Sequence, residues 1–519
     1  MNVAADQPDQ EWGPFGRPIF EDPSARALSR VGVVDVGSNS VRMVVFDGAA
    51  RSPAYFFNEK VMCALGAGLG QTGRLNPEGR ARALSALHRF KSLADGMGLP
   101  TLTIVATAAV RDASDGPAFC AEVEAQTGLK IWVIDGEEEA RLSAQGVLLG
   151  WPGSYGLVCD IGGSSMEFAE ISEGRVGRRV TSALGPLKLR DLKGGKKNRK
   201  THISEGVEAL KAQMGDQRDR LFLVGGSWRA IARIDMLRRN YPLHVLHEYR
   251  MTPAAIRATV KFIAESKIED LRKEAGISAA RMELVPIASE VLARIVRVFK
   301  PKDIAVSSYG IREGMLYEQM PQRLRDRDPL IEASRFAEAK DARIRGFGKQ
   351  LFGFIRPILR TAPESRQRLA RAACLLHDVS WRAHPDYRAE VCFDNATRAN
   401  LGGLKHSERV YLGLALLYRY SNSREGTRFE ALYDLLEPGL QREAEVVGKA
   451  MRFGAMLWMQ KDHDMGQFRW KPKKRELELH LSKDAQPLFG EVAQARLKSL
   501  ANALDANLFV KLGGVRQDN

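Results

Sequence analysis

The chain has 519 residues, of which 44% are hydrophobic and 27% charged, a balance typical of a globular protein with several packed cores. Its net charge of +15 favours a polyanionic partner: nucleic acid, an anionic membrane surface or a phosphate chain. No apolar run has membrane-spanning length. The five cysteines are scattered without a CxxC pair, which argues against a zinc or redox site and predicts reduced thiols in a cytoplasmic protein.

The predicted elements begin after a flexible tail, residues 1–30, which is polar and lacks the basic and apolar segments of a signal peptide. From Val31 to about Tyr317, short β-branched runs alternate with helical segments, which predicts an α/β region. Strands are expected at Val31–Val36, Val41–Phe46, Leu102–Ala106, Ile131–Ile134, Leu157–Ile161, Met166–Ile171, Leu221–Val224 and Asp303–Ser307. Helices are expected at Pro77–Gly96, Glu137–Leu149, Ser204–Met214, Pro253–Ala264 and Ala288–Phe299.

Two further stretches divide the chain. Arg190–Lys200 carries glycine and many charges, which predicts a loop, and a second break follows near residues 319–329. Beyond that break no convincing strand is found, and helical spacing predicts an all-helical last third. Its helices are expected at Arg343–Ile358, Glu364–Leu376, Ser407–Tyr420 and Glu491–Leu504.

One short pattern occurs twice. Val33–Val41 reads VVDVGSNSV and Val158–Met166 reads VCDIGGSSM, so an apolar strand ends in aspartate before a turn of small residues and a second strand. Such turns expose backbone N–H groups that cradle phosphate oxygens, and the aspartate can hold Mg²⁺ or a water. Two such hairpins facing each other across a cleft would clamp a phosphate chain, whereas a single one is an ordinary turn.

The repeat belongs to a larger set of segments. In chain order, these segments are VGVVDVGSNSVRMVVFDG, ATAAVRDASDG, VIDGEEEARL, CDIGGSSMEF, SALGPLKLRD and YGIREGML. Together they resemble the exopolyphosphatase / guanosine pentaphosphate phosphohydrolase family, a branch of the actin–Hsp70–sugar-kinase superfamily. The resemblance implies two actin-like (ribonuclease H-like) α/β domains around a cleft, 31–150 and 151–325, followed by a helical HD-like domain, 326–519.

The resemblance also implies roles for individual residues. Glu139 would be the general base that activates water, with Glu138 as the alternative, because the consecutive glutamates leave the register open by one. Arg111 would contact the terminal phosphoryl group. Asp160 and Glu167 would hold Mg²⁺ and the water, with Asp35 on the opposing turn. The phosphate path would be lined by Ser38, Asn39, Ser40, Gly162, Gly163, Ser164 and Ser165.

These roles suit the chemistry. Phosphoryl transfer needs an aligned nucleophile and compensation of charge, which a carboxylate base and an arginine fork supply. A simpler interpretation stays open, in which Glu137–Glu139 complement the helix dipole and Arg111 is a surface ion-pair partner.

The chain departs from the family pattern at three places. Ser164 replaces a third glycine, which predicts a retained but altered phosphate contact. Asp115 stands where asparagine is frequent and would bring negative charge near a phosphate unless it faces away. Trp228 and Arg229 are bulky where ATP-using relatives bind adenosine, which argues against a kinase or chaperone.

Two further features lie outside the segments that carry the resemblance. His377-Asp378 resembles the HD doublet of metal-dependent phosphohydrolases, but a lone pair lacks the ligand count of a metal site, so a structural HD fold is expected. Two basic runs could form a track for a long polyanion or simply be solvated loops. Their residues are Lys196, Lys197, Arg199 and Lys200 in the first, and Lys471, Lys473 and Lys474 beside Trp470 in the second.

The sequence thus predicts an exopolyphosphatase that uses Mg²⁺ to release orthophosphate from inorganic polyphosphate. Two alternatives remain: a phosphohydrolase acting on guanosine pentaphosphate, and a non-catalytic, polyanion-binding regulatory protein. No nucleic-acid motif is recognised, so nucleic acid is not the expected partner, nor is a membrane. Family precedent implies a homodimer.

Overall fold

The computed structural model describes residues 30–47, 51–99, 102–216, 219–320, 322–457 and 464–512. The predicted tail, residues 1–30, lies outside this part of the chain except for Arg30. The chain divides into two compact units, residues 1–327 and 328–519. The first is mixed α/β and the second mainly helical, which confirms the predicted fold class. None of the helices in the described residues is long and apolar enough to cross a membrane.

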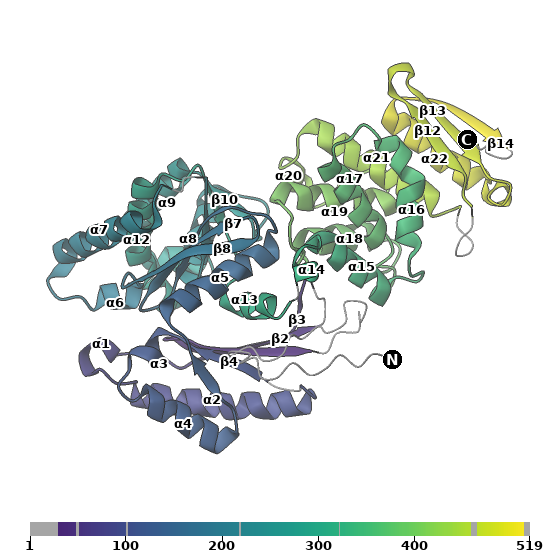
Figure 1. Ribbon diagram of the computed structural model, residues 1–519. Helices are drawn as coiled ribbons and strands as arrows, with labels where there is room; N and C mark the ends of the chain where they lie inside the picture. The colour runs from purple at the N-terminus through teal and green to yellow at the C-terminus, as the bar shows by residue number, and fades with distance from the viewer. Residues whose placement is uncertain are drawn as a thin grey trace. The chain divides into compact units, whose positions relative to one another are not determined.

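The first sheet of the first unit has the strand order β3-β2-β1-β4-β5. Strands β1 and β2 form the first predicted hairpin, and β4 runs parallel to β1. Helices α2 and α4 cover one face of this sheet (Figure 1). The strands are β1 (Val31–Val36), β2 (Ser40–Asp47), β3 (Ala54–Met62), β4 (Leu102–Ala106) and β5 (Ile131–Val133). The helices are α1 (Leu69–Thr72), α2 (Pro77–Gly96), α3 (Ala108–Asp112) and α4 (Gly116–Thr127).

The second sheet repeats this plan, with the order β10-β11-β9-β6-β7-β8. Strands β6 and β7 form the second hairpin, and β9 runs parallel to β6 as β4 does to β1. Its strands are β6 (Gly156–Ile161), β7 (Met166–Ser172), β8 (Arg175–Ser182), β9 (Arg220–Val224), β10 (Tyr249–Met251) and β11 (Asp303–Val306). Its helices are α6 (Pro186–Arg190), α7 (Gly195–Met214), α8 (Gly226–Arg238), α9 (Pro253–Glu265), α10 (Ile268–Glu274), α11 (Ala279–Met282) and α12 (Val285–Phe299).

Helices α5 (Gly136–Gly150) and α13 (Ile311–Glu318) lie between the two sheets (Figure 1). Their apolar residues share one core with strands of both sheets, among them Val33, Val158 and Phe222. The helices cross so closely that a Cβ on Gly314 would lie 1.8 Å from the Leu142 carbonyl oxygen. This shared core joins the two sheets, and α14 (Gln322–Arg325) follows at the end of the unit.

Three strands of the first unit were not predicted: β3, β8 and β10. Each lies at the edge of its sheet. Strand β8, RVGRRVTS, carries three arginines and has no buried residue, because an edge strand can expose charged side chains on both faces. Strand β10 has only three residues, and polar Asn58, Glu59 and Lys60 interrupt the apolar residues of β3, so neither carries an uninterrupted apolar run of strand length.

The predicted loop at Arg190–Lys200 is wrong in its second half. Helix α7 begins at Gly195, so Lys196, Lys197, Arg199 and Lys200 lie in its first turns. The glycine pair that suggested a loop adopts the left-handed backbone conformation, with φ of 95° at Gly194 and 71° at Gly195. These glycines start the helix instead of interrupting it.

The helices of the second unit are α15 (Pro329–Asp341), α16 (Phe347–Ile355), α17 (Glu364–Leu376), α18 (Arg388–Arg398), α19 (His406–Tyr420), α20 (Glu430–Tyr433), α21 (Pro438–Gly454) and α22 (Glu491–Leu504). The four helices predicted for the second unit are present as α16, α17, α19 and α22, and α15, α18, α20 and α21 were not predicted. Short 3-10 turns occupy Arg356–Leu359, Pro472–Lys474 and Gln486–Leu488.

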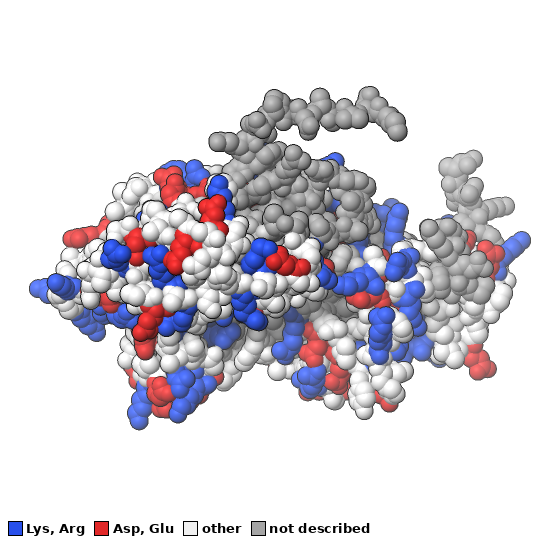
Figure 2. All heavy atoms as spheres, turned by 90° about the horizontal axis from the view of Figure 1, so that it is seen from below, with Lys and Arg blue, Asp and Glu red and all other residues white. Residues whose placement is uncertain are grey.

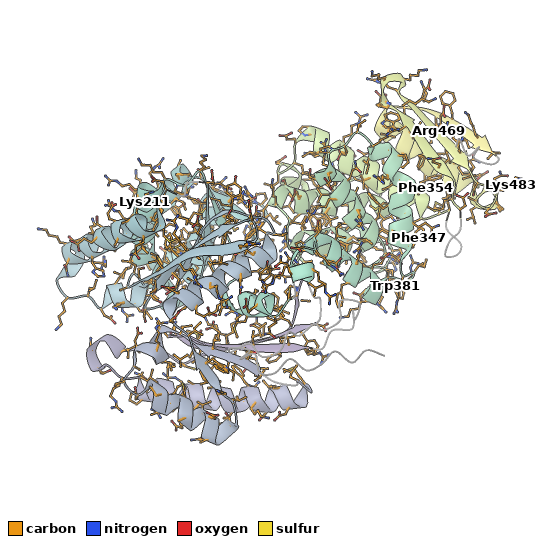
Figure 3. All side chains as sticks on the ribbon, viewed as in Figure 1. Lys211, Phe347, Phe354, Trp381, Arg469 and Lys483 are labelled. Carbon is orange, nitrogen blue, oxygen red and sulfur yellow. The ribbon has the colours of Figure 1, made fainter. Side chains whose placement is uncertain are left out.

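The second unit is not all-helical, and this corrects the prediction. Its described residues include a sheet of β12 (Gln467–Lys471), β13 (Glu476–Leu481) and β14 (Asn507–Leu512). On β12 the side chain of Phe468 packs against Phe354 of α16, with ring centroids 4.7 Å apart, while Arg469 lies on the same strand (Figure 3). The charges of RWKPKKR concealed this strand, because its one buried residue, Phe468, is flanked by exposed Gln467 and Arg469.

Basic residues do not gather into one field on the face drawn in Figure 2, where Lys and Arg side chains are interspersed with Asp and Glu over the described residues. The excess of positive charge therefore does not form a single patch on that face.

Candidate active site

The two predicted turns have the same backbone geometry and meet each other. In the first, the Gly37 N–H donates to the Ser40 carbonyl over 3.0 Å; in the second, the Gly162 N–H donates to the Ser165 carbonyl, also over 3.0 Å. The hydroxyl oxygens of Ser38 and Ser164 lie 3.3 Å apart, although 126 positions separate them in the chain. The repeat seen in the sequence is thus a pair of facing hairpins.

A cavity of about 180 Å³ lies beside these turns. Asp35 and Asp160, the aspartates of the two copies, both line it, and so does Glu139. The predicted phosphate-binding residues that line it are Ser38, Asn39, Ser40, Gly162, Gly163 and Ser165. Ser164 is not among the lining residues, but its hydroxyl meets Ser38. The structure therefore brings most of the predicted phosphate path together.

The two aspartates occupy equivalent positions but have different partners. Arg312 Nη1 lies 3.3 Å from Asp35 Oδ2, and the Ser143 hydroxyl donates a short hydrogen bond to Asp160. Burial raises the pKa of both carboxyls, against the lowering effect of Arg312 on Asp35 and of Ser143 on Asp160. In the first hairpin Asp35 pairs in register with Arg42 on the neighbouring strand, and in the second Asp160 pairs with Glu167. The residue opposite the aspartate is therefore basic in the first hairpin and acidic in the second.

Glu139 lies in the first turn of α5 and is 8% exposed. Its Oε2 atom has no hydrogen-bond partner among the described residues, and Arg111 Nη1 of α3 lies 3.7 Å from it. Burial, with Glu167 and Asp160 nearby, raises the pKa of Glu139 well above its usual value despite Arg111. A buried carboxylate with a free oxygen and an elevated pKa has the properties of a general base.

Glu167 lies behind the cavity rather than on its wall. It is 1% exposed on β7 and accepts a hydrogen bond from the Thr181 hydroxyl over 3.1 Å. Burial and the charge of Asp160 raise the pKa of Glu167 to about 8, although the hydroxyls of Ser165 and Thr181 oppose the shift. The negative charge of Glu167 in turn helps to raise the pKa of Glu139.

The structure separates the two candidate bases. Glu138 is absent from the residues lining the cavity in the described part of the chain. Both its carboxylate oxygens accept hydrogen bonds from Arg141, over 2.7 Å and 2.6 Å. Arg141 in turn pairs with Glu318 over 2.8 Å, so Glu138 belongs to an ion-pair network on the side of α5.

The described residues contain no group of three or more His, Cys, Asp or Glu side chains placed to hold a metal ion. The acidic donors beside the cavity are nevertheless hard carboxylate oxygens, which suit Mg²⁺ or a similar cation. Mg²⁺ characteristically takes one or two carboxylates and completes its shell with water and substrate phosphates. The donor set therefore fits a cation that binds together with its substrate.

The sequence analysis missed most of the basic side chains of the site. Five of them line the cavity, against three carboxylates, which leaves it with an excess of positive charge. They come from strands and helices of both sheets and the connections between them, so no motif spacing could have grouped them. They are Arg42, Lys60, Arg229, Arg281 and Arg312.

Comparison with known proteins agrees with this geometry. The model of the Ppx/GppA phosphatase family matches residues 44–323, more than half of the 519-residue chain. The chain belongs to this family. A second family model, described as the exopolyphosphatase C-terminal domain, matches residues 334–509.

Curated relatives of this Ppx/GppA phosphatase carry different names. Retrograde regulation protein 2 of Saccharomyces cerevisiae is 26% identical over 455 residues, covering 78% of this chain and 75% of its own. Exopolyphosphatase 1 of Mycobacterium tuberculosis is 24% identical over 318 residues, 59% of this chain and 92% of its own. The guanosine-5'-triphosphate,3'-diphosphate pyrophosphatase of Aeromonas salmonicida is 24% identical over 416 residues, 77% of this chain and 82% of its own.

A solved exopolyphosphatase from Cytophaga hutchinsonii has the same fold in the first unit. It superposes with a TM-score of 0.51 at 22% identity and covers 56% of this chain and 98% of its own.

Of the residues that depart from the family pattern, Asp115 and Trp228 do not line the cavity of this phosphatase, whereas Arg229 does. Asp115 accepts a hydrogen bond from the Leu75 N–H over 2.9 Å and pairs with Arg80, and it faces away from the phosphate turns. Trp228 is fully buried, and its indole N–H donates to the Cys159 carbonyl over 3.2 Å. Of the Trp228-Arg229 pair, only Arg229 reaches the cavity.

One residue of each basic run is held in an ion pair, so only part of each run is available to bind a polyanion. Arg199 pairs with Glu290 over 3.2 Å, and Lys471 pairs with Glu476 and Glu478 over 3.3 Å and 2.5 Å. Exposed and without an ion pair among the described residues are Lys196, Lys197, Lys200, Lys473 and Lys474. The first run belongs to the first unit and the second run to the other.

The HD doublet is held by structural contacts. Asp378 receives hydrogen bonds from the Arg343 guanidinium and backbone N–H, both within 3.1 Å, and His377 Nδ1 lies 2.7 Å from the Cys374 carbonyl oxygen. Burial, reinforced by Arg419, lowers the pKa of His377 to about 4. These contacts agree with the structural role expected for the doublet.

Proposed function

We propose that this phosphatase is an exopolyphosphatase, which hydrolyses the terminal phosphoanhydride of inorganic polyphosphate and releases one orthophosphate per turnover. The observation that carries the proposal is the meeting of the two turns at 3.3 Å beside a cavity lined by Glu139 and five basic side chains. A cavity with this charge suits a polyanion, and the turns suit its phosphate groups.

In the proposed reaction, Glu139 accepts a proton from the attacking water while the bond between the terminal phosphorus and the bridging oxygen breaks. Arg111 is not among the described residues that line the cavity, but its Nη1 atom lies 3.7 Å from Glu139. In the proposal its guanidinium contacts the same phosphoryl group and offsets the charge of its oxygens. The backbone N–H groups and hydroxyls of the turns would orient the chain. Ser38, Asn39, Ser40 and the second turn, Gly162–Ser165, fill this role.

Mg²⁺ is the proposed cation, held by Asp160 and Asp35 with Glu167 behind them. When bound, it would neutralise charge on the phosphate oxygens. The proposal also includes a cytoplasmic location and the division of the first unit into domains at 31–150 and 151–325.

A second candidate is hydrolysis of guanosine pentaphosphate, which the Aeromonas relative supports by its name. Measurement of kcat/KM on long polyphosphate and on the nucleotide separates the two.

The name of the yeast relative, a regulation protein, supports a regulatory role. The third candidate is therefore a polyanion-binding regulatory protein that does not hydrolyse its ligand. Phosphate release from polyphosphate and from guanosine pentaphosphate, each with and without Mg²⁺, tests all three. Absence of release from both substrates, at saturating Mg²⁺, would leave only the regulatory function.

A further inference from the structure

The cations of the cavity differ in their partners. Arg312 pairs with Asp35, whereas Arg42, Lys60, Arg229 and Arg281 form no ion pair with any described residue. Arg42 donates to the Asn58 side-chain oxygen over 2.7 Å, and Arg281 donates to the Ser227 hydroxyl over 3.2 Å. Their charge is thus left for a ligand to neutralise.

Two of these arginines lie around the turn between β9 and α8. A Cβ on Gly225 would lie 3.1 Å from Asp160 Oδ1, and a Cβ on Gly226 would lie 2.7 Å from the Arg281 guanidinium carbon. The turn therefore separates the carboxylate of the reacting centre from Arg281. An anion beside Arg281 would be a neighbour of the reacting phosphate, not the reacting phosphate itself.

Arg229 faces the same cavity from the first turn of α8. Burial lowers its pKa to about 10, and repulsion from Arg312 and Arg42 adds to the effect while Asp160 opposes it. A guanidinium that is removed from water and has no ionic partner costs free energy, which a bound anion recovers. Lys60, at the exposed rim, experiences the same repulsion from Arg281, Arg42 and Arg229.

The cavity offers little to a nucleoside. Among the described residues that line it none is aromatic, and Trp228 is turned into the core. A purine base would find arginines where it needs a stacking surface or hydrogen-bond acceptors, although an arginine plane can stack on a base. A chain that consists of phosphate along its whole length matches every one of these cations.

We propose that Arg229 and Arg281 form an inner-phosphate subsite, which binds the phosphate groups behind the reacting one and makes the enzyme select linear phosphate chains by their length. The inference rests on the proposed function and deepens it: the substrate is recognised by several consecutive phosphates, and a nucleoside in their place is a poor substitute.

The test is a chain-length series. Values of kcat/KM are measured for pyrophosphate, tripolyphosphate, tetrapolyphosphate and long polyphosphate, with guanosine pentaphosphate as the nucleoside substrate. In the natural enzyme kcat/KM is expected to rise along the series. In R229M, R281M and the double variant this rise should flatten, with about a tenfold or greater loss per arginine on the longer chains, because each removes a charge-assisted hydrogen bond.

The matched control is R233M, which removes an exposed arginine from the same helix, α8, away from the cavity. It should keep the full dependence on chain length. A second probe is G226A, in which the new methyl displaces the Arg281 guanidinium without removing its charge; it should flatten the series in the same direction as R281M.

The outcomes are distinguishable. If the natural enzyme releases no phosphate from any chain, the proposed function fails, and calorimetric binding of tetrapolyphosphate then decides the subsite alone. An equal loss on every chain length in the arginine variants, or unchanged binding of tetrapolyphosphate, would overturn the subsite. A preference for guanosine pentaphosphate that survives in the double variant would overturn it as well.

Discussion

At the scale of single residues, Glu139 and Glu138 show how neighbouring carboxylates acquire different surroundings. Glu139 lines the cavity and its buried Oε2 atom has no hydrogen-bond partner among the described residues, whereas Glu138 is bound by Arg141. The Glu139→Gln variant keeps the shape of the side chain but cannot accept a proton. We expect kcat for phosphate release to fall by about 10²–10⁴-fold, with binding largely kept. Glu138→Gln is the matched control and should retain kcat within a few-fold.

The elevated pKa of Glu139 has a consequence for the pH dependence of activity. Because Glu139 must be ionised to act as the proposed base, kcat/KM should rise with pH through a value well above the pKa of an ordinary glutamate. A profile that is flat from pH 5 upward would contradict this assignment.

Glu167 links pH to stability. Its pKa is raised from 4.5 to about 8 in the folded chain, so the folded state binds the proton more tightly than the unfolded state. The favourable contribution is complete below pH 4.5 and is lost as the pH rises through 8. Glu167→Gln should therefore stabilise the metal-free protein relative to the natural chain, increasingly from pH 5 to 9. Urea unfolding across this range measures the difference; a difference independent of pH would exclude the mechanism.

At the scale of elements, the crossing of α5 and α13 depends on glycine. A Cβ on Gly314 would lie 1.8 Å from the Leu142 carbonyl oxygen, and backbone cannot yield as a flexible side chain can. Gly314→Ala should destabilise the first unit by about 2 kcal/mol or more through overpacking and reduce activity, since α5 carries Glu139. Gly96→Ala, where nothing lies within 4 Å of the new methyl, is the control and should be neutral or slightly stabilising. Thermal unfolding compares the two.

Some elements could be predicted from the sequence and others could not. The hairpins around Asp35 and Asp160 were predictable because each combines an apolar strand with a turn of small residues. Strand β8 was not, because an edge strand with three arginines has no alternation to detect. The cations of the cavity were missed for another reason: Lys60, Arg229 and Arg281 come from distant segments, and only the folded chain brings them together.

At the scale of the whole molecule, the net charge of +15 predicts binding that weakens with salt. If about four phosphates are engaged by the cations of the cavity, log(1/KM) for long polyphosphate should fall against log[salt] with a slope of about −3. Pyrophosphate should show a smaller slope, because it reaches fewer of the cations. A slope near zero for the long chain would mean that the phosphates are not bound by charge.

The close approach of Ser38 and Ser164 also bears on whether a substrate is cleaved at its end or in its interior. A phosphate group is wider than the 3.3 Å between the two hydroxyl oxygens, so a chain cannot thread between the turns while they touch. Under the proposed function we therefore expect a substrate to reach the turns as a free end and the interior of a polymer to escape cleavage. A ring such as trimetaphosphate offers no end and should survive unchanged in the presence of the enzyme, where its opened, linear form is degraded.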